Sequence, residues 1–308
     1  MNSIASLYKS CRLCPRDCGV DRLAGETGFC GETAALRIGA AVIHKGEEPP
    51  LVGTGGSGTI FISGCNLGCS FCQNYQVSQD GMGKAISPEE FANICASLRG
   101  KGAENINIVT GSHAAPSLIE GINAARKIGV QLPVLWNSSG YDSLETLDIL
   151  KDYVDIFLPD LKTLDSGIAH KFFNAEDYPE TASAAILKMI NFTRDKSKVI
   201  IRHLILPGYL ESTKSVLRWF ADNVKENAML SLMTQYTPIT ERSSVSGKKR
   251  PMPDKYVSQE DYDTVLRWLK EFDIEDGFCQ ELVTGNEWLP DFKRANPFPS
   301  ELSVPVWC

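Results

Sequence analysis

The sequence predicts an α/β fold, a partial (β/α)6 barrel of the TIM type with a cysteine-rich metal-binding head and a C-terminal cover. Short apolar or β-branched runs alternate with helical patterns between residues 59 and 235, as in a chain of parallel βα units. Only six such runs are present, and a complete barrel needs eight. Seven of the ten cysteines lie between Cys11 and Cys72, which predicts a metal-binding start to the chain.

The six predicted strands are short and end in Gly, Pro or polar residues, as buried parallel strands do. We expect them at residues 59–63, 105–110, 133–137, 154–158, 198–206 and 229–235. Apolar residues three and four apart predict the helices between them. These helices are expected at residues 88–99, 117–128, 142–150, 180–192 and 213–227, with one more at 259–272. Ser87 is the predicted N-cap of the first helix.

The chain is expected to divide into three segments. Residues 1–57 form the cysteine-rich head and a Gly/Pro-rich approach, and residues 58–240 form the barrel. Residues 241–308 contain one helical pattern and a Pro-rich tail. Because they supply no two further βα units, we expect them to cover the barrel and not to complete it.

Composition excludes several classes of protein. A hydrophobic fraction of 43% with 22% charged residues is ordinary for a globular chain. No apolar run approaches the roughly 20 residues that span a bilayer, and the N-terminus lacks an apolar signal core. We therefore expect a cytoplasmic protein without a membrane partner. The net charge of −7 disfavours nucleic acid as a partner without excluding it.

Three cysteines follow the first predicted strand: Cys65, Cys69 and Cys72. They fall on the first βα loop, at the carboxyl end of the strands, where barrels of this type place active sites. A closed [4Fe-4S] cube takes four thiolates, so three leave one iron with an open position, as in catalytic metal sites. We expect an iron–sulfur cluster here, and structural zinc or buried thiols are the weaker alternatives.

A second group of cysteines lies in the head: Cys11, Cys14, Cys18 and Cys30. Four thiols so close together, in a chain from a reducing compartment, predict a metal site more readily than disulfides. Their spacing does not distinguish zinc from a second [4Fe-4S] cluster. Zinc or a purely structural role is the favoured interpretation.

The segment CNLGCSFC resembles the CxxxCxxΦC motif of the radical S-adenosylmethionine (SAM) superfamily, in which Phe71 is the expected aromatic residue. The segments VLWNSSGYDSLETLDIL, VDIFLPDLKTLD and MTQYTPI are similar to the branch of pyruvate formate-lyase-activating enzymes, especially its shorter members with a cysteine-rich head. The resemblance covers most of residues 8–300. It implies a [4Fe-4S] cluster whose open iron binds SAM, and reductive cleavage to a 5′-deoxyadenosyl radical that abstracts hydrogen.

The resemblance also implies which residues bind SAM. The turn after the second strand, Gly111 and Ser112, replaces the GGEP sequence of the activating enzymes. His113 beside it is a ligand contact, a proton donor or a capping residue. Asn137 and Ser138 stand where those enzymes have Asp-Thr.

The DLK motif of the activating enzymes is matched by Asp160 and Lys162. By that match Lys162 pairs with the SAM carboxylate, and Asp160 orients it or helps to bind a cation. Arg202 matches an arginine that also faces the carboxylate. Gln73 and Gln235 are expected near substrate or cofactor.

The resemblance to activating enzymes makes a glycyl-radical protein one candidate substrate and implies an electron donor of the flavodoxin or ferredoxin type. The extra cysteines precede the cluster motif here, whereas the activating enzymes with extra clusters carry them after it. Modification of a small molecule or RNA is the alternative activity. A metal-binding interaction module without chemistry is the alternative outside enzymes.

Overall fold

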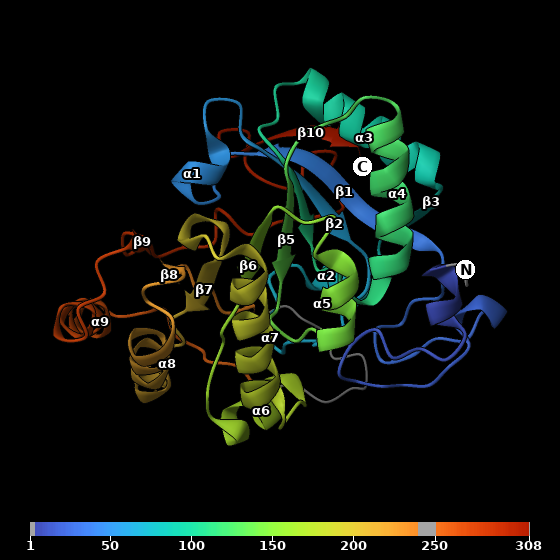
Figure 1. Cartoon of the computed structure of the whole chain (residues 1–308). Coiled ribbons are helices and arrows are strands. Elements are labelled where there is room, and N and C mark those ends of the chain that lie inside the picture. The colour runs from blue at the N-terminus through green and yellow to red at the C-terminus, as the bar shows by residue number, and fades with distance from the viewer. Residues whose placement is uncertain (1–3, 240–250, 308) are drawn as a thin grey trace.

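The computed structural model describes residues 4–239 and 251–307. Its larger sheet has the strand order β10-β1-β2-β4-β5-β6, with β3 paired to β1 (Figure 1). These strands are β1 (Leu36–His44), β2 (Ser57–Ile62), β3 (Lys84–Ile86), β4 (Ile106–Val109), β5 (Val134–Ser138), β6 (Ile156–Pro159) and β10 (Ser303–Trp307). A second sheet contains β7 (Ile200–Leu204), β8 (Met229–Met233) and β9 (Gly277–Cys279) in that order.

The two sheets continue one parallel array. Strands β2, β4, β5 and β6 are parallel neighbours, and so are β7, β8 and β9. Parallel bridges from Phe157 to Val199 and from Asp160 to Arg202 join β6 to β7. The six predicted strands are therefore confirmed, and their carboxyl ends meet at one edge as in a partial barrel.

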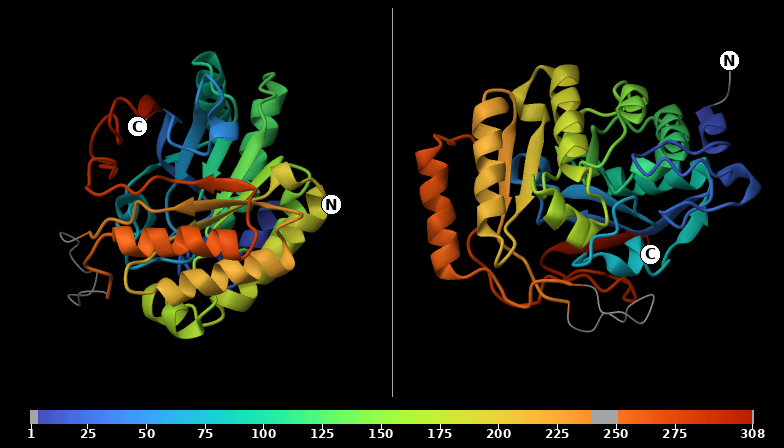
Figure 2. Two further views of the ribbon diagram at one scale, coloured as in Figure 1. Left: turned by 90° about the vertical axis from the view of Figure 1, so that its left-hand side faces the viewer. Right: turned by 90° about the horizontal axis from the view of Figure 1, so that it is seen from below.

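The helices cover the outside of this array (Figure 1). Six of them match predictions: α3 (Pro88–Gly100), α4 (Ala115–Lys127), α5 (Leu144–Leu150), α7 (Tyr178–Thr193), α8 (Leu210–Asn223) and α9 (Gln259–Glu271). Ser87 caps α3 by accepting from the backbone N–H of Glu90. Figure 2 shows α8 and α9 side by side along the smaller sheet. No helix in the described part of the chain is long and apolar enough to cross a membrane.

Several elements were not predicted. The helices are α1 (Pro49–Val52), α2 (Tyr75–Ser78) and α6 (Ser166–Phe173), and four 3-10 turns lie at Ile4–Tyr8, Arg22–Ala24, Ser112–Ala114 and Lys196–Lys198. Strand β1 lies inside the segment expected to form the head, yet it pairs antiparallel with both β2 and β10. Part of the expected head and part of the expected cover thus extend the sheet.

Candidate active site

A cavity of about 440 Å³ opens at the carboxyl ends of the parallel strands. This volume is within the range of roughly 300–1,000 Å³ that is usual for small-molecule sites. Successive strand ends and loops supply its wall, so residues far apart in the sequence meet there. Among the predicted site residues, the cavity is lined by Cys65, Cys69, Phe71, Cys72, Gln73, Asn137, Ser138, Asp160, Lys162, Arg202 and Gln235.

The three cysteines of the loop after β2 contribute one wall. The loop turns at Gly64 and Gly68, where φ is +79° and +69°, values that favour glycine. The Leu67 backbone N–H donates to Cys65 Sγ at 3.3 Å, and Cys72 Sγ lies 3.3 Å from Ser78 Oγ. Burial raises the pKa of the Cys65 and Cys69 thiols, so ligation by a metal is what would hold them as thiolates.

Three thiols on one short loop are the kind of donor set that an iron–sulfur cube takes. Within residues 4–239 and 251–307, no three His, Cys, Asp or Glu side chains converge closely enough to hold one metal ion. A cube does not require such convergence, because each of its thiolates binds a different iron. The Phe71 ring anchors the loop to the core by packing edge-on against Phe172 and Tyr236.

Lys162 and Asp160 form an ion pair in the cavity wall, with Nζ 2.5 Å from Oδ2, and their side chains are 18% and 19% exposed. Burial lowers the pKa of Lys162, but its interactions with Asp160, Cys69 and Tyr178 together raise it overall. The lysine therefore stays positively charged beside the cysteine loop. Its charge also acts to lower the pKa of Cys69 against the effect of burial.

Arg202 is held by two glutamates that the sequence did not single out. Its Nη1 lies 3.5 Å from Glu47 Oε2 and its Nε 3.4 Å from Glu48 Oε1. Burial raises the pKa of Glu47 to about 7, although Arg202 opposes that shift. Both acids lie directly before α1, in a segment whose sequence resembles a Gly/Pro-rich connection. Their contact with Arg202 on β7 depends on the pairing of β1 with β2, which the sequence did not predict.

The C-terminal segment adds a wall that motif comparison does not suggest. Trp288, Pro290 and Phe298 line the cavity, and the ring of His44 at the end of β1 lies 5.0 Å from the Phe298 ring. Burial lowers the pKa of His44 to about 4, so His44 is neutral near pH 7. These residues make that side of the cavity largely apolar.

The turn after β4 is placed differently from the expectation. Thr110 lines the cavity, whereas Gly111, Ser112 and His113 are not part of its wall. Ser112 Oγ donates to Asp142 Oδ1 at 2.5 Å, and a ring nitrogen of His113 lies 2.7 Å from the Ser63 carbonyl oxygen. Burial lowers the pKa of His113 to about 4. These contacts hold the turn against its neighbours. Because the His113 ring is neutral near pH 7, it is not an imidazolium acid there.

The remaining predicted contacts gather near the cysteine loop. Gln73 Nε2 donates to the Gln235 carbonyl oxygen at 3.0 Å, which joins the loop to the end of β8. Ser138 Oγ donates to Asp142 Oδ2 at 2.5 Å, and Asn137 lies directly before it in β5.

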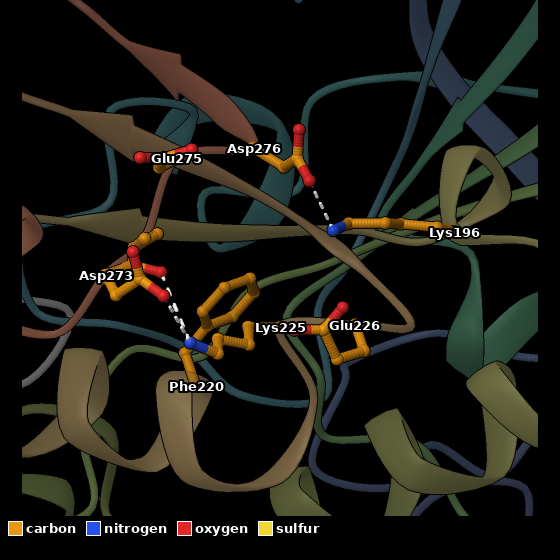
Figure 3. A pocket seen from close by; sticks show the side chains of 8 residues that line it. Lys196, Phe220, Lys225, Glu226, Asp273, Glu275 and Asp276 are labelled. Carbon is orange, nitrogen blue, oxygen red and sulfur yellow. Dashed lines mark hydrogen bonds and ion pairs between the residues drawn. The ribbon is translucent and has the colours of Figure 1, made fainter.

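A separate surface hollow beyond α8 is lined by Lys196, Lys225, Asp273 and Asp276. Lys196 pairs with Asp276 and Lys225 pairs with Asp273 (Figure 3).

Comparison with known proteins shows the family of this chain. The model of the radical SAM superfamily matches residues 59–220, more than half of the 308 residues. The uncharacterized protein MJ0674 of Methanocaldococcus jannaschii is 29% identical over 278 residues, covering 88% of this chain and 77% of that protein.

Two crystal structures share the fold at low identity. A radical SAM methyltransferase from Sphaerobacter thermophilus has a TM-score of 0.54 at 15% identity, over 73% of this chain and 66% of the methyltransferase. Streptococcus suis SuiB bound to S-adenosylmethionine has a TM-score of 0.50 at 13% identity, over 70% of this chain and 48% of SuiB. The chain thus spans about half the length of SuiB. The family implies a [4Fe-4S] cluster and SAM as cofactors. By the match over residues 59–220, the chain belongs to the radical SAM superfamily.

Proposed function

We propose that Cys65, Cys69 and Cys72 ligate the cluster of this radical SAM enzyme, and that SAM binds beside them in the cavity. The observation that carries the proposal is the shared wall: three thiols and the buried Lys162–Asp160 pair line one cavity at the strand ends. When bound, the cluster supplies the electron that splits the sulfonium of SAM, whose 5′-deoxyadenosyl fragment takes a hydrogen atom from the substrate.

Lys162 is the residue proposed to hold the carboxylate of SAM. Its ammonium group is charged, mostly buried and already oriented by Asp160, so a second carboxylate gains a charge-assisted hydrogen bond at little cost in ordering. Ser138 and Asn137 offer neutral polar groups on the neighbouring strand end. Arg202 is partly neutralised by Glu47 and Glu48, so we assign it the weaker share of carboxylate binding.

The apolar wall of Trp288, Pro290 and Phe298 is proposed to face the substrate and to limit the access of water. A cavity of about 440 Å³ leaves little room beyond a bound cofactor, which favours a small molecule or a thin loop of protein. A glycine-bearing loop is the candidate we put forward, because the segments that resemble pyruvate formate-lyase-activating enzymes contain the DLK residues of this cavity. An electron donor of the flavodoxin or ferredoxin type completes the proposed reaction.

The test is anaerobic reconstitution with iron and sulfide, reduction with dithionite, and measurement of 5′-deoxyadenosine and methionine formed from SAM. We expect both products from the wild-type chain and from Cys279→Ala, which alters an exposed thiol outside the cavity, and neither from Cys69→Ala. A fully loaded wild-type protein that forms neither product would refute the proposed function.

A second experiment tests the activase role. A glycyl-radical protein added to the assay should show a protein radical by EPR, and absence of that radical would count against the activase role.

A further inference from the structure

The four cysteines of the head lie in one tightly folded segment. The Cys11 backbone N–H donates to the Val20 carbonyl oxygen at 3.0 Å, and the Gly19 N–H donates to the Cys11 carbonyl oxygen at the same distance. All four are free thiols, with Cys11 and Cys14 buried and Cys18 and Cys30 partly buried. The segment thus holds buried thiols without using them in disulfides.

Two of these sulfur atoms, those of Cys11 and Cys18, have an N–H group directed at them. The Phe29 backbone N–H donates to Cys18 Sγ at 3.4 Å, and the Arg22 guanidinium donates to Cys11 Sγ at 3.8 Å. N–H donors of this kind stabilise negative sulfur, as in metal-bound thiolates.

The backbone contact at Cys18 repeats a feature of the cavity loop. The Phe29 N–H donates to Cys18 Sγ at 3.4 Å, just as the Leu67 N–H donates to Cys65 Sγ at 3.3 Å. Gly28 also makes room for the Cys18 sulfur, because a Cβ at this position would lie only 2.7 Å from Cys18 Sγ. The head is therefore built around its sulfur atoms in the same way as the loop proposed to ligate the first cluster.

The head also packs directly on that loop. The Arg16 side chain donates from Nε to the Asn66 carbonyl oxygen at 2.9 Å and from Nη2 to the Leu67 carbonyl oxygen at 3.3 Å. A Cβ on Gly64 would lie 2.8 Å from the Cys30 carbonyl oxygen, so the two cysteine segments touch beside Cys65. A zinc knuckle that only stabilises the head would not require this contact.

We propose that Cys11, Cys14, Cys18 and Cys30 ligate a second [4Fe-4S] cluster, fully ligated by protein and seated against the loop of the first. Four thiolates complete a cube and leave no open iron. Three ligands close in sequence with a remote fourth match iron–sulfur spacing, whereas structural zinc sites commonly pair their ligands two by two. The cluster has no site for SAM, and its place beside Cys65 suits it to one-electron exchange with the first cluster.

Two complementary variants of the full chain separate the sites. After anaerobic reconstitution, the wild-type chain and the Cys279→Ala control should each contain about eight iron and eight sulfide. The variant Cys65→Ala/Cys69→Ala/Cys72→Ala should keep about four of each, and Cys14→Ser/Cys30→Ser should also keep about four. The reduced EPR signal of the triple variant should be unchanged by SAM, because its cluster has no open iron.

The triple variant leaves the head intact, so it tests the proposal even if the head variant does not fold. A triple variant with no iron, or with one zinc per chain in place of iron, would overturn the second cluster. A head variant without iron, beside a triple variant that keeps about four, would instead count against the first cluster and the proposed function.

Discussion

Nε of Arg202 lies 3.4 Å from Oε1 of Glu48, which joins strand β7 to the start of α1 beside the cavity. Glu47 contacts the same guanidinium at 3.5 Å. The side chains of Arg202, Glu47 and Glu48 are 18%, 7% and 6% exposed. The arginine that motif comparison assigns to SAM is thus also the counter-charge of two buried acids. Its replacement is therefore expected to change the stability of the protein even without a bound cofactor.

Replacing Arg202 should destabilise the protein in the absence of SAM. Arg202→Ala leaves two buried carboxylates without their cation, a change that typically costs about 3–5 kcal/mol. Urea unfolding of the cluster-free protein should show this loss, and adding Glu48→Gln to the variant should recover part of it. An Arg202→Ala protein as stable as wild type would show that the ion pairs contribute nothing.

Glu47 should make stability depend on pH. Burial raises its pKa from 4.5 to about 7, so the folded protein binds this proton more tightly than the unfolded chain. The resulting stabilisation is complete below about pH 4.5 and is lost as the pH rises through about 7. Between about pH 5 and 8, Tm should therefore fall more steeply for wild type than for Glu47→Gln. Parallel profiles would contradict this assignment.

Replacing Lys162 should weaken SAM binding and leave the cluster in place. Loss of one charge-assisted hydrogen bond of about 1.5–3 kcal/mol corresponds to roughly 10–100-fold in Kd. Equilibrium binding of SAM to reconstituted Lys162→Ala should show this change at unchanged iron content. Lys171→Ala is the control, since Lys171 is exposed and donates to the Tyr209 hydroxyl outside the cavity. Equal affinity in both variants would remove Lys162 from the site.

Gly111 should be needed for packing more than for contact with SAM. A Cβ at this position would lie 2.6 Å from the buried Trp136 ring, and overpacking of a core typically costs about 1–3 kcal/mol. Chemical unfolding should show that loss for Gly111→Ala. Gly100→Ala in α3, where nothing lies within 4 Å of the added atom, should be neutral or gain up to about 1 kcal/mol. Equal stability in the two variants would contradict this packing role.

The parallel strands and their helices could be predicted because each is a short buried run or an amphipathic pattern of local origin. The antiparallel strands β1 and β10 were harder to predict from the sequence. Strand β1 lies in a segment dominated by cysteine and glycine signals, and β10 contains Pro305, which favours a non-strand prediction. The structure accommodates this proline because β10 is the edge strand of its sheet.

The cysteine loop and the Asp160–Lys162 pair could also be predicted, since each lies immediately after a strand and matches a motif. Glu47, Glu48 and Trp288 could not. Their place beside the cavity depends on how β1 and the C-terminal segment fold back on the barrel, and no local pattern specifies that. His113 shows the opposite case, because its position after β4 suggests function whereas its contacts are with the Ser63 carbonyl oxygen and the head.

The proposed function depends most on a cluster held by Cys65, Cys69 and Cys72 with one iron open to SAM. The direct measurement is EPR spectroscopy of the reduced cluster before and after addition of SAM, made on the Cys14→Ser/Cys30→Ser variant so that only the cavity site contributes. We predict a [4Fe-4S] signal whose g values change when SAM binds the open iron. A cluster signal that SAM leaves unchanged, or no cluster at all in a folded variant, would contradict the account.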